Sequence, residues 1–277
     1  MSYRHIEVSQ AEGVCRVALN QPERMNALGM GPGSNRDELL RALAAADADD
    51  AVGCLVIAAN GSAFCGGGDL SGNKPRETAY EDWRFHADAE AFHAALRGLR
   101  KPLVAAVNGL CLGAGLGLIA QCDLVVAASD ARFGLVEGRI GLSGASSIVH
   151  LVGSSWAKFL ILTGEVISAV RAERIGLVFV VVPQDELRAR VQDLGARIAR
   201  LPREAVQLNK AAIDKVVDAA GLAAAREVAS AVDPVITSAG RTATAPDGRL
   251  FRDILRSEGV PGLKKARELQ YTTNWLE

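Results

Sequence analysis

The segment Lys101–Asp123, KPLVAAVNGLCLGAGLGLIAQCD, decides the fold of this chain. It opens with an apolar run, Leu103 to Val107, that is typical of a buried strand. After the turn at Asn108-Gly109 it places three glycines between positions 113 and 117, ahead of a short helix. Such a strand-to-helix junction leaves the first N–H groups of the helix without partners and adds the positive end of the helix dipole. The segment therefore predicts half of a site for an anionic oxygen.

A second glycine cluster, Gly66-Gly67-Gly68, also comes after an apolar run, the strand predicted at Val52–Ala58. Glycine lets the backbone approach a ligand closely, so one N–H group from each cluster could converge on a single oxygen. Taken alone, either cluster is more typical of a tight turn. Because both stand in the same setting, together they favour an oxyanion site.

Composition and charge exclude several classes of protein. The chain has 277 residues, 49% of them apolar, which suffices for a sizeable core. A net charge of −1 gives no electrostatic footprint for nucleic acid or for a membrane surface. No apolar run could span a bilayer, and the N-terminus has no signal-peptide core, so we expect a cytoplasmic protein. The five cysteines show no CxxC spacing, so reduced buried thiols are expected rather than disulfides or a metal site.

The order of apolar runs predicts strands that alternate with helices, which indicates a largely α/β core. The predicted strands are the hairpin of Ile6–Val8 and Val14–Leu19, then Val52–Ala58, Leu103–Val107, Leu124–Ala128 and Leu177–Val182. The predicted helices are Arg36–Asp47, Thr78–Gly98, one that ends near Gly153, then Ala157–Leu162, Asp185–Arg200 and Ala205–Val217. Nothing strand-like follows Pro183, so the last third reads as a helical region, with 238–249 as a flexible loop.

One alternative is a dinucleotide site, because Gly115–Ala120 matches the pattern GxGxxA. That pattern needs glycines at the end of a strand and an acidic residue about 20 positions later. Here the next strand begins right after Asp123, so the helix between them is too short. We therefore disfavour nucleotide binding.

Four motifs in register carry a family resemblance. They are Pro22–Leu28 (PERMNAL), Phe64–Leu70 (FCGGGDL), Lys101–Asp123 and Ala172–Pro183 (AERIGLVFVVVP). In these motifs the chain resembles the enoyl-CoA hydratase/isomerase, or crotonase, superfamily, from about residue 6 to residue 183 and weakly beyond.

The resemblance implies a spiral of ββα repeats in residues 1–200, which would carry an acyl-CoA site. Residues 201–277 would form a helical trimerisation or lid region, in a homotrimer or a hexamer built as a dimer of trimers. The substrate would be a coenzyme A thioester, without a further cofactor and without a metal. Fatty acid metabolism is one of several pathways that use this fold.

The thioester oxygen would be held by the backbone amides of Gly68 and Ala114. Met25 and Ala27 would lie near the adenine end of coenzyme A. The resemblance places the rest of the substrate site around these positions, at Ala63, Phe64, Gly66, Gly67, Asp69, Leu70, Gly113 and Gly117.

The sequence departs from the family pattern at Gly117. Hydratases of the family carry one glutamate there and a second in the loop that here contains Glu137. Hydration uses two carboxylates, whereas moving a double bond needs one group that carries a proton between two carbons. We therefore expect an enoyl-CoA isomerase that uses Glu137. A hydratase or acyl-CoA hydrolase with an unidentified second group, and a non-catalytic acyl-CoA-binding protein, remain alternatives.

Four further expectations concern residues near the proposed site. Dienoyl-CoA isomerases and dehalogenases place a carboxylate where Ala145 stands, so both are disfavoured. Gly117 is expected to leave room for a bulky or branched acyl group. His86 and His93, seven residues apart, could share one helical face, and packing there is favoured over a metal pair. Asp69 is expected to cap a helix that begins directly after it.

Overall fold

The computed structural model describes residues 3–71, 76–271 and 273–276. Its larger sheet has the strand order β1-β2-β3-β5-β7-β10, antiparallel between β1 and β2 and parallel elsewhere. The strands are β1 (Ile6–Ala11), β2 (Val14–Leu19), β3 (Cys54–Ala59), β5 (Leu103–Val107), β7 (Leu124–Ala128) and β10 (Val180–Val182). The predicted hairpin is therefore confirmed, as are the predicted bounds of β5 and β7.

A second, smaller sheet has the order β4-β6-β8-β9, with β8 and β9 antiparallel and the other pairs parallel. Its strands are β4 (Ala63–Cys65), β6 (Leu110–Leu112), β8 (Arg132–Gly134) and β9 (Val166–Ser168). None of these four strands was predicted, because three residues are too few to show a period.

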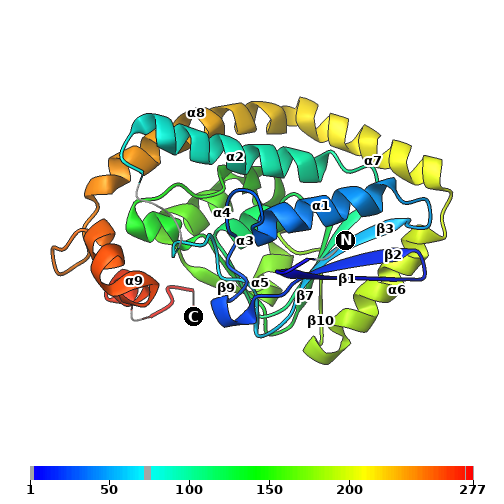
Figure 1. Ribbon diagram of the computed structural model, residues 1–277, viewed down its shortest axis with the longest axis horizontal. Coiled ribbons are helices and arrows are strands. Elements are labelled where there is room, and N and C mark those ends of the chain that lie inside the picture. Colours follow the sequence, from blue (N-terminus) through cyan, green and yellow to red (C-terminus); the bar gives the residue numbers. More distant parts are fainter. Residues whose placement is uncertain (1–2, 72–75, 272, 277) are drawn as a thin grey trace.

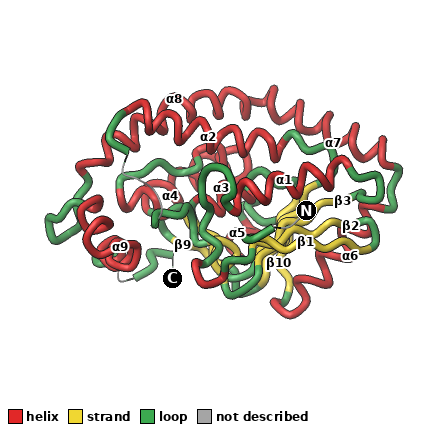
Figure 2. The backbone as a smooth tube through the Cα atoms, viewed as in Figure 1, coloured by secondary structure: helices red, strands yellow, loops and turns green. Residues whose placement is uncertain are grey.

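Helices cover the two sheets, as Figures 1 and 2 show. They are α1 (Asn35–Ala48), α2 (Ala79–Arg97), α3 (Ala114–Ile119), α4 (Val149–Thr163), α5 (Ala169–Arg174), α6 (Leu187–Ala199), α7 (Arg203–Val217), α8 (Ala223–Ala239) and α9 (Phe251–Glu268). The long helices α2 and α8 pack side by side over one face of the molecule (Figure 1).

The predicted ββα repeats are present. Three successive units, β3-β4-α2, β5-β6-α3 and β7-β8-α4, each give one strand to the larger sheet and the next strand to the smaller one. The C-terminal helical region is also present as α7, α8 and α9. Nothing in the structure tests a division at residue 200, which stays a prediction.

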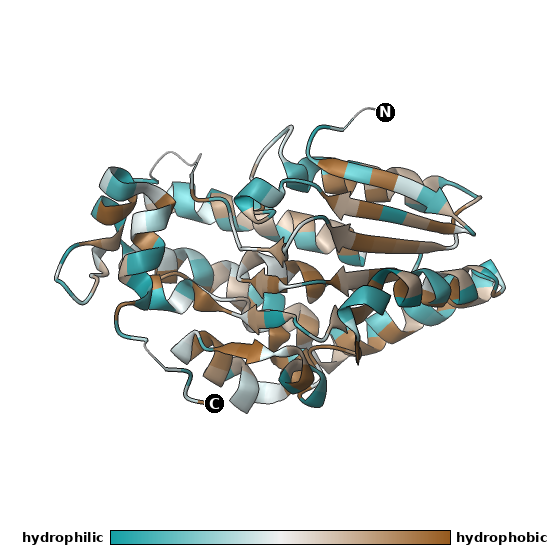
Figure 3. Cartoon of the chain, turned by 90° about the horizontal axis from the view of Figure 1, so that it is seen from below, coloured by the Kyte–Doolittle hydropathy of each residue, from teal (hydrophilic) through white to brown (hydrophobic). Residues whose placement is uncertain are grey.

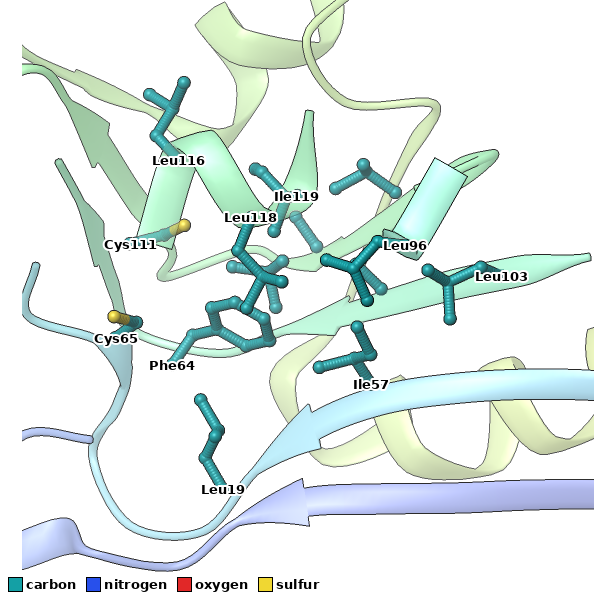
Figure 4. Close-up of a cluster of buried hydrophobic side chains, with 14 of the residues drawn as sticks. Leu19, Ile57, Phe64, Cys65, Leu96, Leu103, Cys111, Leu116, Leu118 and Ile119 are labelled. Atoms are coloured by element: carbon teal, nitrogen blue, oxygen red, sulfur yellow. The ribbon is translucent and has the colours of Figure 1, made fainter. Parts of the chain in front are cut away.

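The main core lies between the sheets and the helices. Phe64 and Leu19 are fully buried in it, together with Ile57 and Leu118 (Figure 4). Figure 3 shows the strands of the larger sheet as mostly hydrophobic, while the surrounding helices mix hydrophobic and hydrophilic residues. The five cysteines are unpaired, as the sequence predicted, and four of them are buried.

Three local predictions need correction. The helix expected to end near Gly153 continues to Thr163, with a kink at Gly153, where φ is 73°. The last strand begins at Val180, because the amides of Leu177 and Val178 bond back to the carbonyl of Ala172 at the end of α5. The expected loop 238–249 is partly helical, since α8 runs to Ala239 and a 3-10 turn follows it.

No helix begins directly after Asp69 in the part of the chain that the structure describes, so the expected cap at Asp69 is wrong. The next helix, α2, begins at Ala79 and is capped by Thr78, whose hydroxyl accepts from the amide of Glu81. The Asp69 carboxylate instead accepts from the amide of Ser71 at 2.9 Å and pairs with Arg24 at 2.8 Å. It therefore fixes the loop after the glycines to the loop that precedes Met25.

Candidate active site

Three segments of the site follow three neighbouring parallel strands. Gly66–Gly68 follows β4, Gly113-Ala114 follows β6, and Glu137 comes three residues after β8. The carboxyl ends of parallel strands meet at one edge of a sheet, so segments more than 60 residues apart in the chain converge there. The amide of Gly113 donates to the carbonyl of Gly134 at 2.9 Å, which holds two of these segments together.

The Met25–Leu28 loop is tied to the first glycine cluster by backbone hydrogen bonds. The amide of Gly66 donates to the carbonyl of Met25 at 2.7 Å, and that of Leu28 to Gly67 at 2.8 Å. Buried Asn26 holds the loop from behind, since its side-chain amide donates to the carbonyls of Asn60 and Ala63. The loop therefore orients the Cys65–Gly66 and Gly67–Gly68 peptide units, and the second of these carries the amide of Gly68.

Neither the amide of Gly68 nor that of Ala114 donates to any acceptor among the described residues. Both residues line one cavity of about 240 Å³. An amide without a partner next to a cavity is a donor available to a ligand. The site thus offers two free backbone donors from two different strand ends.

Most of the predicted site residues line this cavity. They are Gly66, Gly67, Gly68, Asp69, Leu70, Gly113, Ala114, Gly117 and Glu137. Ala63 and Phe64 instead belong to β4 and are buried in the core, outside the cavity wall. Met25 packs against Gly66, while the carbonyl of Ala27 accepts from the side chain of Asn35. The proposed contacts of Met25 and Ala27 with coenzyme A stay predictions.

Glu137 lies in a 3-10 turn, Val136–Ile140, and faces the second glycine cluster. Its Oε2 atom is buried and has no hydrogen-bond partner among the described residues. Burial raises the pKa of the Glu137 carboxyl to about 7. A carboxyl with this pKa exists in both protonation states near neutral pH, as a proton-transfer group requires.

Gly113 is required at its position for two reasons. Its φ of 53° and ψ of −116° lie in a region that side chains disfavour. A Cβ atom there would also lie 2.0 Å from Oε1 of Glu137. The missing side chain at 113 therefore lets the carboxylate approach the backbone just before the free amide of Ala114.

Gly117 stands one helical turn after Ala114, and the imidazole of His93 faces it. A Cβ atom at 117 would lie 3.5 Å from Cε1 of His93 and 3.9 Å from Cβ of Ala145. The space beside Gly117 is thus bounded by His93. Burial, together with the charge of Arg36, lowers the pKa of His93 to about 4, so the imidazole is neutral at neutral pH.

Helices α2 and α8 form a polar wall of the cavity that the sequence analysis did not assign to the site. His86 contacts the hydroxyl of Thr237 at 2.8 Å, and Glu90 accepts from Arg226 at 2.6 Å. Asp233 lines the same wall, and burial raises its pKa to about 6. The spacing of seven residues between His86 and His93 was the available signal, but Thr237, the partner of His86, lies 151 residues further along the chain.

Arg36 of α1 also lines the cavity and was likewise missed. It is only 9% exposed, and its Nε has no partner among the described residues.

The described residues contain no cluster of three or more metal-binding side chains. Among their helices, none is both long and apolar enough to cross a bilayer.

Comparison with known proteins identifies relatives of the chain. Residues 9–239 match the family model described as enoyl-CoA hydratase/isomerase. Crotonyl-CoA hydratase of Syntrophomonas wolfei is 36% identical over 78% of this chain and 83% of its own length. The 2,3-dehydroadipyl-CoA hydratase of Escherichia coli is 35% identical over 80% of this chain and 87% of its own length.

Solved structures of enoyl-CoA hydratases are also similar to this chain. An enoyl-CoA hydratase/isomerase from Xanthobacter autotrophicus Py2 superposes with a TM-score of 0.86 at 28% identity, covering 98% of this chain and all of that one. A probable enoyl-CoA hydratase from Mycobacterium thermoresistibile superposes with a TM-score of 0.80 at 29% identity, covering 86% of this chain and 96% of that one. The similarity therefore extends over the helices as well as the sheets.

Proposed function

Since the chain belongs to the enoyl-CoA hydratase/isomerase, or crotonase, family, we propose that it moves the double bond of an enoyl-CoA thioester. Glu137 is the group that carries the proton from one carbon to the other. The substrate is a coenzyme A thioester, and the reaction needs no further cofactor, because a proton transfer next to a thioester involves no redox step.

The two free amides support this chemistry. Removing a proton next to the thioester places negative charge on the carbonyl oxygen, and the amides of Gly68 and Ala114 have no other acceptor among the described residues. Losing one such donor typically costs about a hundredfold to a thousandfold in rate. The donors belong to the backbone and therefore survive most side-chain substitutions.

One observation carries the proposal: the unpaired Oε2 of Glu137 beside the glycine junction, on a carboxyl with a pKa of about 7. The group can take a proton from one carbon and return it to another without a large energetic penalty in either state. Hydration uses a second group as well, so that water is oriented and deprotonated while carbon is protonated. Gly117 has no side chain, and neutral His93 beside it holds no acidic proton at neutral pH.

Hydration is the second candidate, and two observations favour it. The similar curated proteins are named hydratases. The imidazole of His93 also occupies the space next to Gly117, where a neutral ring nitrogen could orient a water molecule. In that case His93 would be the missing second group.

Incubation with trans-3-enoyl-CoA and, separately, trans-2-enoyl-CoA tests the proposal, with products resolved by chromatography and mass detection. Conversion of the 3-enoyl to the 2-enoyl compound at unchanged mass supports the isomerase. Addition of one water to the 2-enoyl compound would overturn it in favour of the hydratase. Release of free coenzyme A would indicate an acyl-CoA hydrolase, and binding without turnover a non-catalytic acyl-CoA-binding protein.

An assembly of three or six copies completes the proposal. Large apolar side chains are exposed on the C-terminal helices, among them Leu208 (71%), Ile213 (64%) and Val216 (69%) on α7 and Val228 (62%) and Val235 (65%) on α8. Exposed apolar surface of this kind marks contact sites between proteins. Light scattering coupled to size-exclusion chromatography should therefore give a homotrimer or a dimer of trimers, and a monomer would contradict this.

A further inference from the structure

Arg36 is a buried cation in the wall of the cavity without an anionic partner. It projects from α1, is nine-tenths buried, and lines the cavity. No carboxylate among the described residues forms an ion pair with it, and its Nε atom has no acceptor there. Burying an unpaired charge costs several kcal/mol.

The other arginines of the cavity wall differ in this respect. Arg76 pairs with Asp82 at 2.9 Å, and Arg267 contacts Glu268 at 2.5 Å. Only Arg36, among the described arginines that line the cavity, lacks a carboxylate. Arg36 is therefore the arginine of the cavity wall whose charge is left for a ligand to neutralise.

Neighbouring groups hold the Arg36 side chain, and the charge of exposed Asp88 acts on it without forming an ion pair. Its guanidinium carbon lies 5.0 Å from the centre of the Phe92 ring, and Nη1 lies 2.6 Å from Sδ of Met30. A cation over an aromatic face gains less than the desolvation of the charge costs. These contacts fix the position of the guanidinium, and its Nε–H group remains available to a ligand.

The position of Arg36 assigns it to the acyl end of the site. Its guanidinium lies over the ring of Phe92, whose centroid is 5.8 Å from that of the His93 ring, and His93 lies against Gly117, one helical turn past the free amide of Ala114. The resemblance places the adenine end of coenzyme A at the Met25–Leu28 loop. An anionic group near Arg36 would therefore belong to the acyl chain.

We propose that the acyl chain of the substrate ends in a carboxylate, which Arg36 binds in the cavity beside His93. The proposal rests on the acyl-CoA site proposed above and names its substrate class, the ω-carboxyacyl thioesters. Two carboxylates on the α2–α8 wall do not exclude it. Glu90 pairs with Arg226, and burial raises the pKa of Asp233 only to about 6, so Asp233 is mostly ionised at neutral pH but forms no ion pair with Arg36.

Binding of saturated thioesters, which cannot isomerise, tests the proposal without turnover. Calorimetry would compare succinyl-, glutaryl- and adipoyl-CoA with butyryl-, valeryl- and hexanoyl-CoA, each pair matched in chain length. A hydrogen-bonded charge pair is worth about 1.5–3 kcal/mol, so at the fitting length the carboxylated thioester should bind at least about tenfold more tightly. The absence of any preference in the wild-type protein would overturn the proposal, whatever the variants do.

Arg36→Met should abolish the preference while leaving the affinity for the uncharged thioesters within about threefold. Arg41→Met is the matched control, since Arg41 lies on the same helix, half exposed, and pairs with Asp37; it should keep the preference. Equal weakening of all six thioesters by Arg36→Met would overturn the proposal, because Arg36 would then serve the coenzyme A phosphates or the fold. Thermal melting of each variant confirms that it is folded.

The two proposals fail separately. Selective binding of a carboxylated thioester without conversion of any 3-enoyl-CoA would leave the assignment of Arg36 standing and remove the isomerase. Conversion of 3-enoyl-CoA together with equal affinities within every pair of thioesters would support the isomerase and remove the assignment of Arg36.

Discussion

Glu137→Gln should abolish catalysis and at the same time stabilise the protein at alkaline pH. The wild-type carboxyl is buried without a partner at Oε2, and its pKa is raised from 4.5 to about 7. Glutamine keeps the shape of the side chain but cannot ionise. The substitution therefore removes both the proton carrier and the cost of burying its charge.

The magnitude follows from that pKa. In the unfolded chain Glu137 loses its proton near its usual pKa, whereas in the folded chain it keeps the proton up to about pH 7. The folded state thus binds more protons between these values, so the free energy of unfolding falls as the pH rises through this window. Above it the wild type carries a penalty of about 3 kcal/mol, at 1.36 kcal/mol per pKa unit. Below the window the penalty disappears.

Urea unfolding at about pH 5 and about pH 8 measures this effect, at one protomer concentration because assembly shifts apparent stability. The gain in stability of Glu137→Gln should be about 2–3 kcal/mol larger at the higher pH. The control is Glu186→Gln, because Glu186 is exposed and lies outside the cavity. A gain that does not change with pH, or a variant less stable than wild type at about pH 8, would refute the argument.

Activity gives the second half of this prediction. Loss of a general acid–base group typically costs about a hundredfold to ten-thousandfold, so kcat/KM for a 3-enoyl-CoA should fall by that factor. Affinity for a saturated thioester should change little, since the two amide donors remain. Unaltered turnover would remove Glu137 from the reaction.

Two further substitutions test the architecture of the site. Gly113→Ala should cost activity and about 1–3 kcal/mol of stability in thermal or chemical unfolding, because its Cβ would lie 2.0 Å from Oε1 of Glu137. Gly248→Ala shares the positive φ but would meet nothing within 4 Å, so a larger loss at 113 isolates the contact with the carboxylate. Asp82→Asn should cost about 2–4 kcal/mol in urea unfolding, because a side chain only 1% exposed would lose charge pairing with two arginines; a loss below about 0.5 kcal/mol would show that the pairs contribute little.

The sequence was most informative where one local pattern determines structure. The apolar runs Leu103–Val107 and Leu124–Ala128 match β5 and β7 residue for residue, because strands buried on both faces read as continuous apolar runs. The glycine clusters mark the cavity because a close backbone approach excludes side chains there. The buried strands and the glycine turns at the cavity were thus predictable from local sequence.

Contacts between distant segments were not predictable in the same way. His86 meets Thr237 across 151 residues, and no local pattern links α2 with α8. Arg36 looks like an ordinary helix-surface residue until the fold buries it against Phe92. The expected cap at Asp69 failed because its carboxylate found a partner in Arg24, 45 residues earlier in the chain. Each depends on tertiary packing, which overrides local preference.

The pH dependence of kcat/KM for the conversion of a 3-enoyl-CoA tests the single-carboxylate account most directly. Only the ionised form of Glu137 can begin the reaction, so kcat/KM should rise with pH through one pKa near 7 and then stay level. A second group that must be protonated would add a falling limb. A single rising limb is the predicted result, and a bell-shaped profile would contradict it.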